Sequence, residues 1–262
     1  LTNGVDPPIK WTGSGNVTAL DVDSRFTTAS HVGYWDNRVW LGNTNANSDR
    51  LWYSDAGDPE TWGSTSFYNF GAPITAIVPM QNALSVHTED AIYTLIPTGN
   101  ATIPYQRQQR TSSDPRNPQR GGTISGRAVV VLPGNIQVFP LEDGIYMWSG
   151  GDTIDKVSYA LDEGYWDRLV ASRLAESFAI YYATEDEIWF FLAYGTGQTK
   201  FNHVMILSTK HLYQDASTGE TRMAWYGPYE NGTSFERNTA AIIDNKPHAG
   251  DYDGIVFDHA PA

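Results

Sequence analysis

Apolar and polar residues alternate in short runs along this chain, and turns rich in Asp, Asn and Gly separate the runs. Leu141–Trp148 (LEDGIYMW) is the clearest case, because an acidic pair precedes Ile and an aromatic residue. Thr88–Leu95 (TEDAIYTL) and Thr184–Phe191 (TEDEIWFF) repeat that pattern. Alternating runs joined by residues that tolerate a positive φ angle are typical of β-hairpins. The pattern predicts that the three acidic pairs occupy equivalent turns, at the same end of successive sheets.

Two weaker copies of the pattern, Tyr34–Leu41 and Asp251–Asp258, extend the repeat toward both ends of the chain. Hairpins that recur in this way indicate sheets fanned about an axis more than a sandwich of two sheets. We therefore predict an all-β fold, a β-propeller of about five or six blades, in a single domain that covers residues 1–262.

A helical period occurs once. Trp166, Leu169, Val170 and Leu174 fall on one face if the segment 162–175 is helical. Elsewhere 24 Gly and 14 Pro favour short strands and turns. The sequence predicts one short helix in an otherwise β-structured chain.

The two ends of the chain complement each other. Residues 1–11 contain the pair Pro7-Pro8, which suits an edge strand, and residues 240–258 begin a sheet that lacks strands. We expect residues 1–11 to complete that last sheet and to close the ring, since an open sheet edge invites aggregation. The chain starts at Leu1 and stops after a strand-like run, so we also expect it to be part of a longer protein.

Composition excludes several classes of function. The absence of Cys excludes disulfides, thiol catalysis and thiolate metal sites. A net charge of −13, from 17 basic and 30 acidic residues, disfavours general nucleic-acid binding because phosphates are repelled. The sequence shows neither a run of 18 apolar residues nor a leader pattern, so we expect no membrane span and no signal peptide in it.

One segment of this acidic chain is basic. Arginines recur between residues 98 and 127, with Gln, Asn and Pro among them. One interpretation is a strand at 105–110 followed by a solvated loop, and the other is a contact with an acidic neighbouring subunit or with DNA. The candidate contact residues are Arg107, Arg110, Arg116 and Arg120.

The acidic residues have structural explanations that we prefer to catalytic ones. The acidic pairs resemble glycosidase carboxylates in type, but hairpin turns explain them better. The segment 54–62 is similar to the Asp box of sialidase-type propellers, although its spacing departs from Ser-x-Asp-x-Gly-x-Thr-Trp. Calcium ligands are conceivable at Asp251 and Asp253, or at Asp55 with Asp58, but the full loop pattern is missing. The six histidines lack ligand spacing, and the sequence shows no Gly-x-Ser-x-Gly elbow, phosphate loop or dinucleotide fingerprint. We therefore predict no catalytic residue, no cofactor and no metal site.

Five motifs, taken in order, resemble a known family. They are TNGVDPP (2–8), NRVWLGN (37–43), RLWYSDAGDPETW (50–62), ITAIVPMQNALSVHTEDAIYTL (74–95) and AGDYDGIVF (249–257). This combination resembles the β-propeller structural proteins of tailed-bacteriophage tails and necks, the tail-tube nozzle group among them. The resemblance covers most of residues 1–258 through motif order, and none of its motifs is highly specific alone.

The resemblance implies a structural virion protein and not an enzyme. Such a protein would form a ring of copies in the tail or neck, contact other tail proteins and let genomic DNA pass without specific binding. Its location would be the virion tail, after assembly in the host cytoplasm. The alternative is a carbohydrate-binding or glycan-processing propeller of sialidase type, which Trp35, Tyr68 and Trp225 would serve by stacking on sugar rings. A cellular scaffold propeller is a third interpretation.

Overall fold

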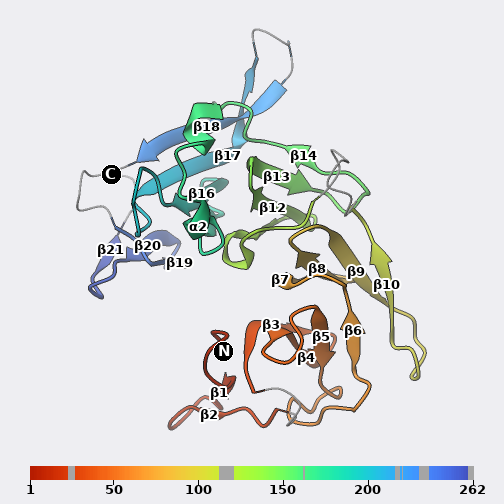
Figure 1. The fold of residues 1–262 in the computed structure, drawn as a ribbon. Helices are drawn as coiled ribbons and strands as arrows, with labels where there is room; N and C mark the ends of the chain where they lie inside the picture. The colour runs from red at the N-terminus through yellow and green to blue at the C-terminus, as the bar shows by residue number, and fades with distance from the viewer. Residues whose placement is uncertain are drawn as a thin grey trace. The chain divides into compact units, whose positions relative to one another are not determined.

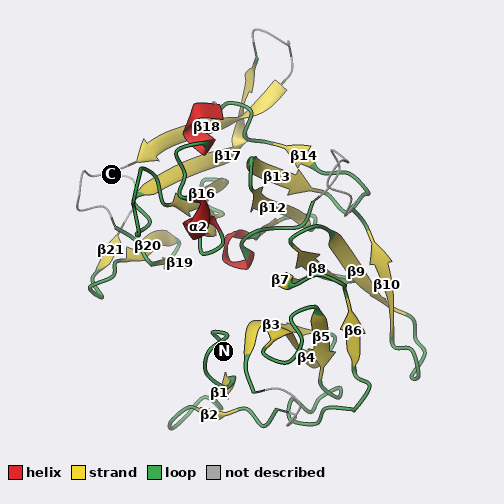
Figure 2. Cartoon of the chain, viewed as in Figure 1, coloured by secondary structure: helices red, strands yellow, loops and turns green. Residues whose placement is uncertain are grey.

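The computed structural model describes residues 1–22, 27–111, 121–161, 163–215, 219, 221–229 and 236–258. The chain divides into two compact units, Leu1–Gly126 and Arg127–Ala262. Strands dominate the described residues of both units, and the helices among them are short (Figure 2). The all-β prediction is therefore confirmed.

Unit 1 contains two four-stranded antiparallel sheets whose strands follow one another in chain order (Figure 1). The first sheet consists of β3 (Ala29–Trp35), β4 (Arg38–Thr44), β5 (Arg50–Tyr53) and β6 (Phe67–Asn69). The second consists of β7 (Ile74–Pro79), β8 (Leu84–Thr88), β9 (Ile92–Pro97) and β10 (Tyr105–Gln109). Asp36 and Asn37 join β3 to β4 with φ angles of 51° and 57°, a left-handed conformation that Asp and Asn tolerate.

Unit 2 repeats this arrangement. One four-stranded sheet consists of β11 (Val130–Leu132), β12 (Ile136–Leu141), β13 (Gly144–Trp148) and β14 (Asp155–Lys156). Another consists of β15 (Phe178–Tyr182), β16 (Glu187–Leu192), β17 (His203–Gln214) and β18 (Thr221–Tyr229). A three-stranded sheet consists of β19 (Thr239–Ile243), β20 (Lys246–Gly250) and β21 (Val256–Asp258). Four-stranded sheets that follow chain order are the pattern of propeller blades.

The predicted single helix is wrong in one respect, because the segment forms two helices, α1 (Glu163–Trp166) and α2 (Ala171–Leu174). Between them, Leu169 makes an isolated β-bridge with Tyr194, and the Val170 N–H donates to the Ala193 carbonyl oxygen at 3.0 Å. These contacts to a neighbouring segment replace helical hydrogen bonds. Trp166, Leu169 and Leu174 are nevertheless buried, as the helical period predicts.

The amino-terminal residues pair locally. β1 (Ile9–Lys10) forms a two-stranded sheet with β2 (Thr18–Ala19), and the Gly4 N–H donates to the Ala29 carbonyl oxygen at 2.8 Å. The Lys10 ammonium also pairs with the Glu60 carboxylate. Closure of a ring between residues 1–11 and 240–258 stays a prediction.

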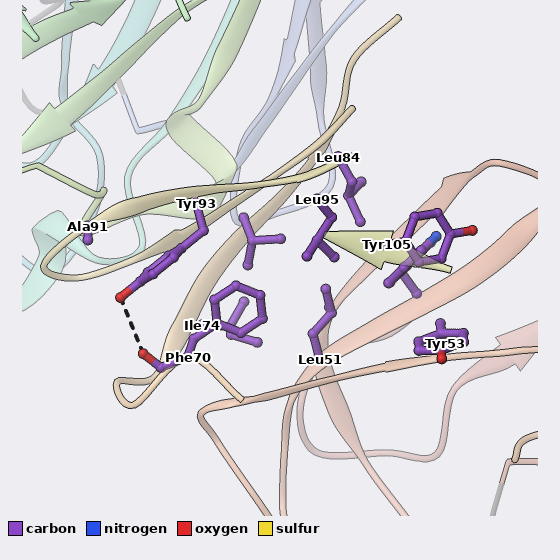
Figure 3. Packing of buried hydrophobic residues seen from close by; sticks show 11 residues of the cluster. Leu51, Tyr53, Phe70, Ile74, Leu84, Ala91, Tyr93, Leu95 and Tyr105 are labelled. Atoms are coloured by element: carbon purple, nitrogen blue, oxygen red, sulfur yellow. Dashed lines mark hydrogen bonds between the residues drawn. The ribbon is translucent and has the colours of Figure 1, made fainter. Parts of the chain in front are cut away.

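The core of unit 1 joins its two sheets. Figure 3 shows Leu51 and Tyr53 of β5 facing Leu95 and Tyr105 from β9 and β10, and all four side chains are buried. Trp40 lies in the same cluster, with its ring centre 5.1 Å from the ring centre of Tyr105. Large flat side chains of this kind fill the wedge between twisted sheets.

The first sheet is buried on its other face as well. Leu41 and Trp52, each adjacent in sequence to a residue of the first cluster, pack with Leu20 and Trp62. A strand points successive side chains to opposite faces, so neighbouring residues can both be buried. In unit 2, Phe178 and its neighbours form an equivalent core between the last two sheets.

Candidate functional site

The basic segment 98–127 contains β10, which confirms the strand predicted at 105–110. Arg107 is exposed, and its guanidinium lies 5.6 Å from the ring centre of Phe70 and 5.8 Å from that of Tyr93. Both rings belong to the core of unit 1. The Arg107 side chain therefore covers this core while its charge stays in contact with water.

Arg107 and Arg110 point to opposite faces of the second sheet. The Nε–H of Arg110 donates to the Thr94 hydroxyl at 2.9 Å, whereas Arg107 lies over the adjacent Tyr93. The structure therefore does not bring these two arginines together in one patch. The other two predicted contact residues, Arg116 and Arg120, lie outside the described residues.

The three acidic pairs do not occupy equivalent turns. Glu89-Asp90 joins β8 to β9 and Glu142-Asp143 joins β12 to β13, but Glu185-Asp186 joins β15 to β16. The last pair thus follows the first strand of its sheet and not the second, which puts it at the opposite end of the strands. The prediction is wrong for this pair because the same residue types form different turns. Asp186 has a left-handed φ of 55°, whereas Asp90 and Asp143 do not have a positive φ.

A pocket of about 580 Å³ opens beside the β12–β13 turn of unit 2. It is bounded by the turn, by β14 and by the segment that leads into α1. Its lining consists of Glu142, Asp143, Lys156, Ser158, Tyr159, Leu161, Trp166 and Asp167. The pocket therefore combines carboxylates, one ammonium group and aromatic rings.

Hydrogen bonds fix one side of this pocket. Lys156 Nζ donates to the Asp143 carbonyl oxygen at 2.6 Å and lies 3.2 Å from its carboxylate. The Tyr146 hydroxyl donates to the same carboxylate at 2.9 Å. Burial, followed by this hydrogen bond, raises the pKa of the Tyr146 phenol. Tyr146 therefore remains a protonated donor that holds Asp143 in place.

The opposite side of the pocket is aromatic. Tyr159 is 57% exposed, and the Arg222 guanidinium lies over its ring, 4.7 Å from the ring centre. Arg222 is itself held by an ion pair of 2.8 Å with Asp215. Trp166, at the end of α1, is buried. An exposed ring with a fixed neighbour can receive the apolar face of a ligand.

Sequence reasoning missed this pocket. It correctly assigned Asp143 to a turn and Trp166 to an apolar helical face, but it gave Lys156 and Tyr159 no role. Gly144 belongs to the same arrangement, because a Cβ atom there would lie 2.5 Å from Lys156 Cε and 2.6 Å from Ser158 Oγ. The glycine leaves space for the lysine, and this spatial relation is not visible in the sequence.

The loop similar to an Asp box is structural. The Asp58 carboxylate accepts hydrogen bonds from the Glu60 N–H at 3.0 Å and the Thr61 hydroxyl at 2.8 Å. These bonds, the Glu60 N–H first, lower the pKa of Asp58. The loop places Trp62 in the cluster with Leu41 and Trp52 on the other face of the first sheet. This arrangement explains the motif without catalysis.

The conceivable calcium ligands also have backbone partners. One Asp251 carboxylate oxygen accepts from the Asp253 N–H at 2.9 Å and the Ile255 N–H at 2.8 Å. Within the part of the chain that the structure describes, no group of three or more His, Asp or Glu residues could hold a metal ion.

The aromatic residues that favoured sugar stacking are bonded within the protein. Trp35 Nε1–H donates to the Met80 carbonyl oxygen at 3.0 Å, and Trp225 Nε1–H donates to that of Val157 at 2.8 Å. The Tyr68 hydroxyl donates to the Tyr105 carbonyl oxygen at 2.9 Å. All three rings are half-buried. Their positions are explained by packing.

His31 on β3 has a pKa that burial lowers from 6.5 to about 4. Gly126 approaches it closely, since a Cβ atom there would lie 3.2 Å from His31 Cε1. The ring is therefore neutral in the folded chain at pH 7.

Acidification is expected to destabilise the chain through His31. Between pH 6.5 and 4 the unfolded chain protonates this residue and the folded chain does not, so its contribution is present above pH 6.5 and lost as the pH falls toward 4. The loss amounts to at most about 3 kcal/mol. Urea unfolding at pH 7.5 and pH 4.5 measures it, and His31→Gln should lose less stability over this interval than the wild type. Equal losses would contradict the prediction.

No helix within the described ranges has the length and apolar character needed to cross a membrane.

Comparisons with known proteins identify the fold. No family model matches the chain, and no curated protein matches its sequence. The extracellular domain of a B. thetaiotaomicron one component system matches 97% of this chain with a TM-score of 0.54 and 10% identity. This chain spans about a third (33%) of that structure.

Two further structures agree. Virginiamycin B lyase from Staphylococcus aureus, an inactive H270A variant crystallised with quinupristin, has a TM-score of 0.51 and 13% identity over 93% of this chain and 73% of its own. Hsv2 from Kluyvelomyces marxianus has a TM-score of 0.50 and 9% identity over 90% of this chain and 62% of its own. At such low identity these likenesses concern the fold alone. Together with the four-stranded sheets, they show that the chain has a β-propeller fold.

Proposed function

We propose that this chain is a structural virion protein of a tailed bacteriophage, part of a ring of copies in the tail or neck around the DNA channel. The observation that carries the proposal is the order of five motifs along residues 2–257, which resembles that family. The proposed role is mechanical and not enzymatic. Sheets buried on both faces, as the first sheet of unit 1 is, support a rigid part.

The charge of the chain agrees with such a role. A net charge of −13 repels the phosphate backbone, so DNA would pass along an acidic surface without binding tightly. Within this proposal the partners are further copies and other tail proteins, and the location is the virion tail.

The proposal is tested by electron cryo-microscopy of the purified chain and of particles of a phage that encodes it. We expect closed rings of the isolated chain or density for it in the tail or neck. A chain that stays monomeric at all concentrations and is absent from particles would refute the proposal.

Arg107, the arginine of β10, provides a sharper prediction. Arg107→Glu is expected to weaken self-association about 10-fold, because Arg107 is exposed and would face an acidic surface of a neighbouring copy. Sedimentation equilibrium at low and high salt measures the change. Lys210→Glu alters the charge equally at another exposed position and is expected to leave association unchanged. Equal effects of both substitutions would rule out a specific contact.

A further inference from the structure

The pocket beside the β12–β13 turn has a mixed set of charges. Glu142 and Asp167 line it, and within the described part of the chain neither carboxylate has a hydrogen-bond or ion-pair partner. Lys156 lies in the same lining with its ammonium group bound to Asp143. The pocket therefore offers both free acceptors and a fixed donor.

This combination discriminates between classes of ligand. A small anion would be repelled, because the three carboxylates of Glu142, Asp143 and Asp167 outnumber the single ammonium group of Lys156, which Asp143 already neutralises. A metal ion lacks a suitable cluster among the described side chains. A neutral ligand with several hydroxyl groups can donate to the carboxylates and accept from the ammonium group.

The aromatic side adds a second requirement. Tyr159 is exposed, and the part of its ring that Arg222 does not cover gives an apolar surface next to the polar groups. Pyranose rings have an apolar C–H face and a rim of hydroxyl groups, so they satisfy both sides of the pocket. The volume of about 580 Å³ lies within the range of small-molecule sites, about 300 to 1,000 Å³.

The polar side is arranged before any ligand arrives. Tyr146 and Lys156 both bind Asp143, and Gly144 leaves the space that the Lys156 side chain occupies. Preorganised groups lose little conformational entropy on binding. We propose that this pocket binds a neutral saccharide, with Tyr159 against the sugar ring and Glu142, Asp167 and Lys156 bonded to its hydroxyl groups.

The inference goes beyond the proposed function and does not depend on it. A part of a phage particle can present a sugar site on its surface, and so can a propeller with another role. The association measurements with Arg107→Glu test the ring of copies, whereas the sugar titrations below test this pocket.

The test is a titration of the full chain with maltose, cellobiose and N,N′-diacetylchitobiose, followed by calorimetry and saturation-transfer NMR. We expect at least one sugar to bind with a Kd of about 1 mM or lower. Tyr159→Ala and Glu142→Gln should weaken binding about 10-fold or more, and Tyr159→Phe, which keeps the ring, should retain it. Glu89→Gln changes the corresponding turn in unit 1 and should bind as the wild type does.

Three outcomes would overturn the inference. The first is that none of the three sugars binds. The second is that spermidine or glucuronate, added as charged probes, binds at this pocket more tightly than the sugars. The third is that Tyr159→Ala and Glu142→Gln bind sugar as the wild type does while their thermal unfolding shows that they are folded.

Discussion

Replacing Trp40 with alanine is expected to lower the free energy of unfolding by about 4 kcal/mol. The indole is fully buried between the two sheets of unit 1, and its ring centre lies 5.1 Å from those of Tyr53 and Tyr105. Its Nε1–H donates to the Trp35 carbonyl oxygen at 3.0 Å. The substitution removes these contacts and leaves a cavity that rigid sheets cannot fill. Urea unfolding followed by circular dichroism measures the loss.

A tryptophan outside the core provides the control for this substitution. Trp11 is 63% exposed, so Trp11→Ala is expected to change stability by less than about 0.5 kcal/mol. Trp40→Phe keeps an aromatic ring and should fall between the two alanine variants. If Trp40→Ala lowered the free energy of unfolding by less than about 1 kcal/mol, these aromatic residues would not be what holds the two sheets together.

Gly122→Ala is expected to cost about 3 kcal/mol of stability, although it adds a single methyl group. A Cβ atom at this position would lie 1.7 Å from the Thr88 carbonyl oxygen and 3.0 Å from the Ala91 nitrogen. The neighbouring Thr123 N–H donates to the same carbonyl at 3.0 Å. Because the obstructing atoms belong to backbone, the segment must move and lose this hydrogen bond. Differential scanning calorimetry measures the result as a lower Tm.

Gly151→Ala is the matched control, because a Cβ atom at Gly151 meets no heavy atom within 4 Å. Its Tm should stay within about 2 °C of the wild-type value. If Gly122→Ala were as stable as Gly151→Ala, residues 121–123 would not pack as closely against the β8–β9 turn as described.

The fold could be predicted because local residue types determine its strands and turns. Strands such as β4 and β5 are short runs of branched and aromatic residues, and turns such as Asp36-Asn37 carry residues that accept positive φ. The helical segment was harder to predict. The apolar period continues through Leu169, but contacts with Tyr194 and Ala193 interrupt the helix there. Such partners, distant in sequence, are not visible in a local pattern.

The candidate site was predicted less well, for a related reason. Arg107 was assigned correctly to a strand. The pocket, however, was missed, because it forms only when the folded chain brings Lys156 and Tyr159 to the Glu142-Asp143 turn. The similar residue types also led to the wrong position for Glu185-Asp186, since Asp186 adopts a left-handed φ of 55° and Asp143 does not have a positive φ. Residue types predict that a turn is present, but not which two strands of the sheet the turn connects.

The outermost position of β10 has a consequence for solubility. One row of its backbone N–H and C=O groups lacks a partner strand in the described sheet, and such rows can seed fibrillar stacking of identical molecules. Arg107 opposes this, because two β10 strands aligned side by side would bring like charges close together. Arg107 thus disfavours pairing of β10 with β10 of another copy, but it still allows contact between β10 and an acidic surface.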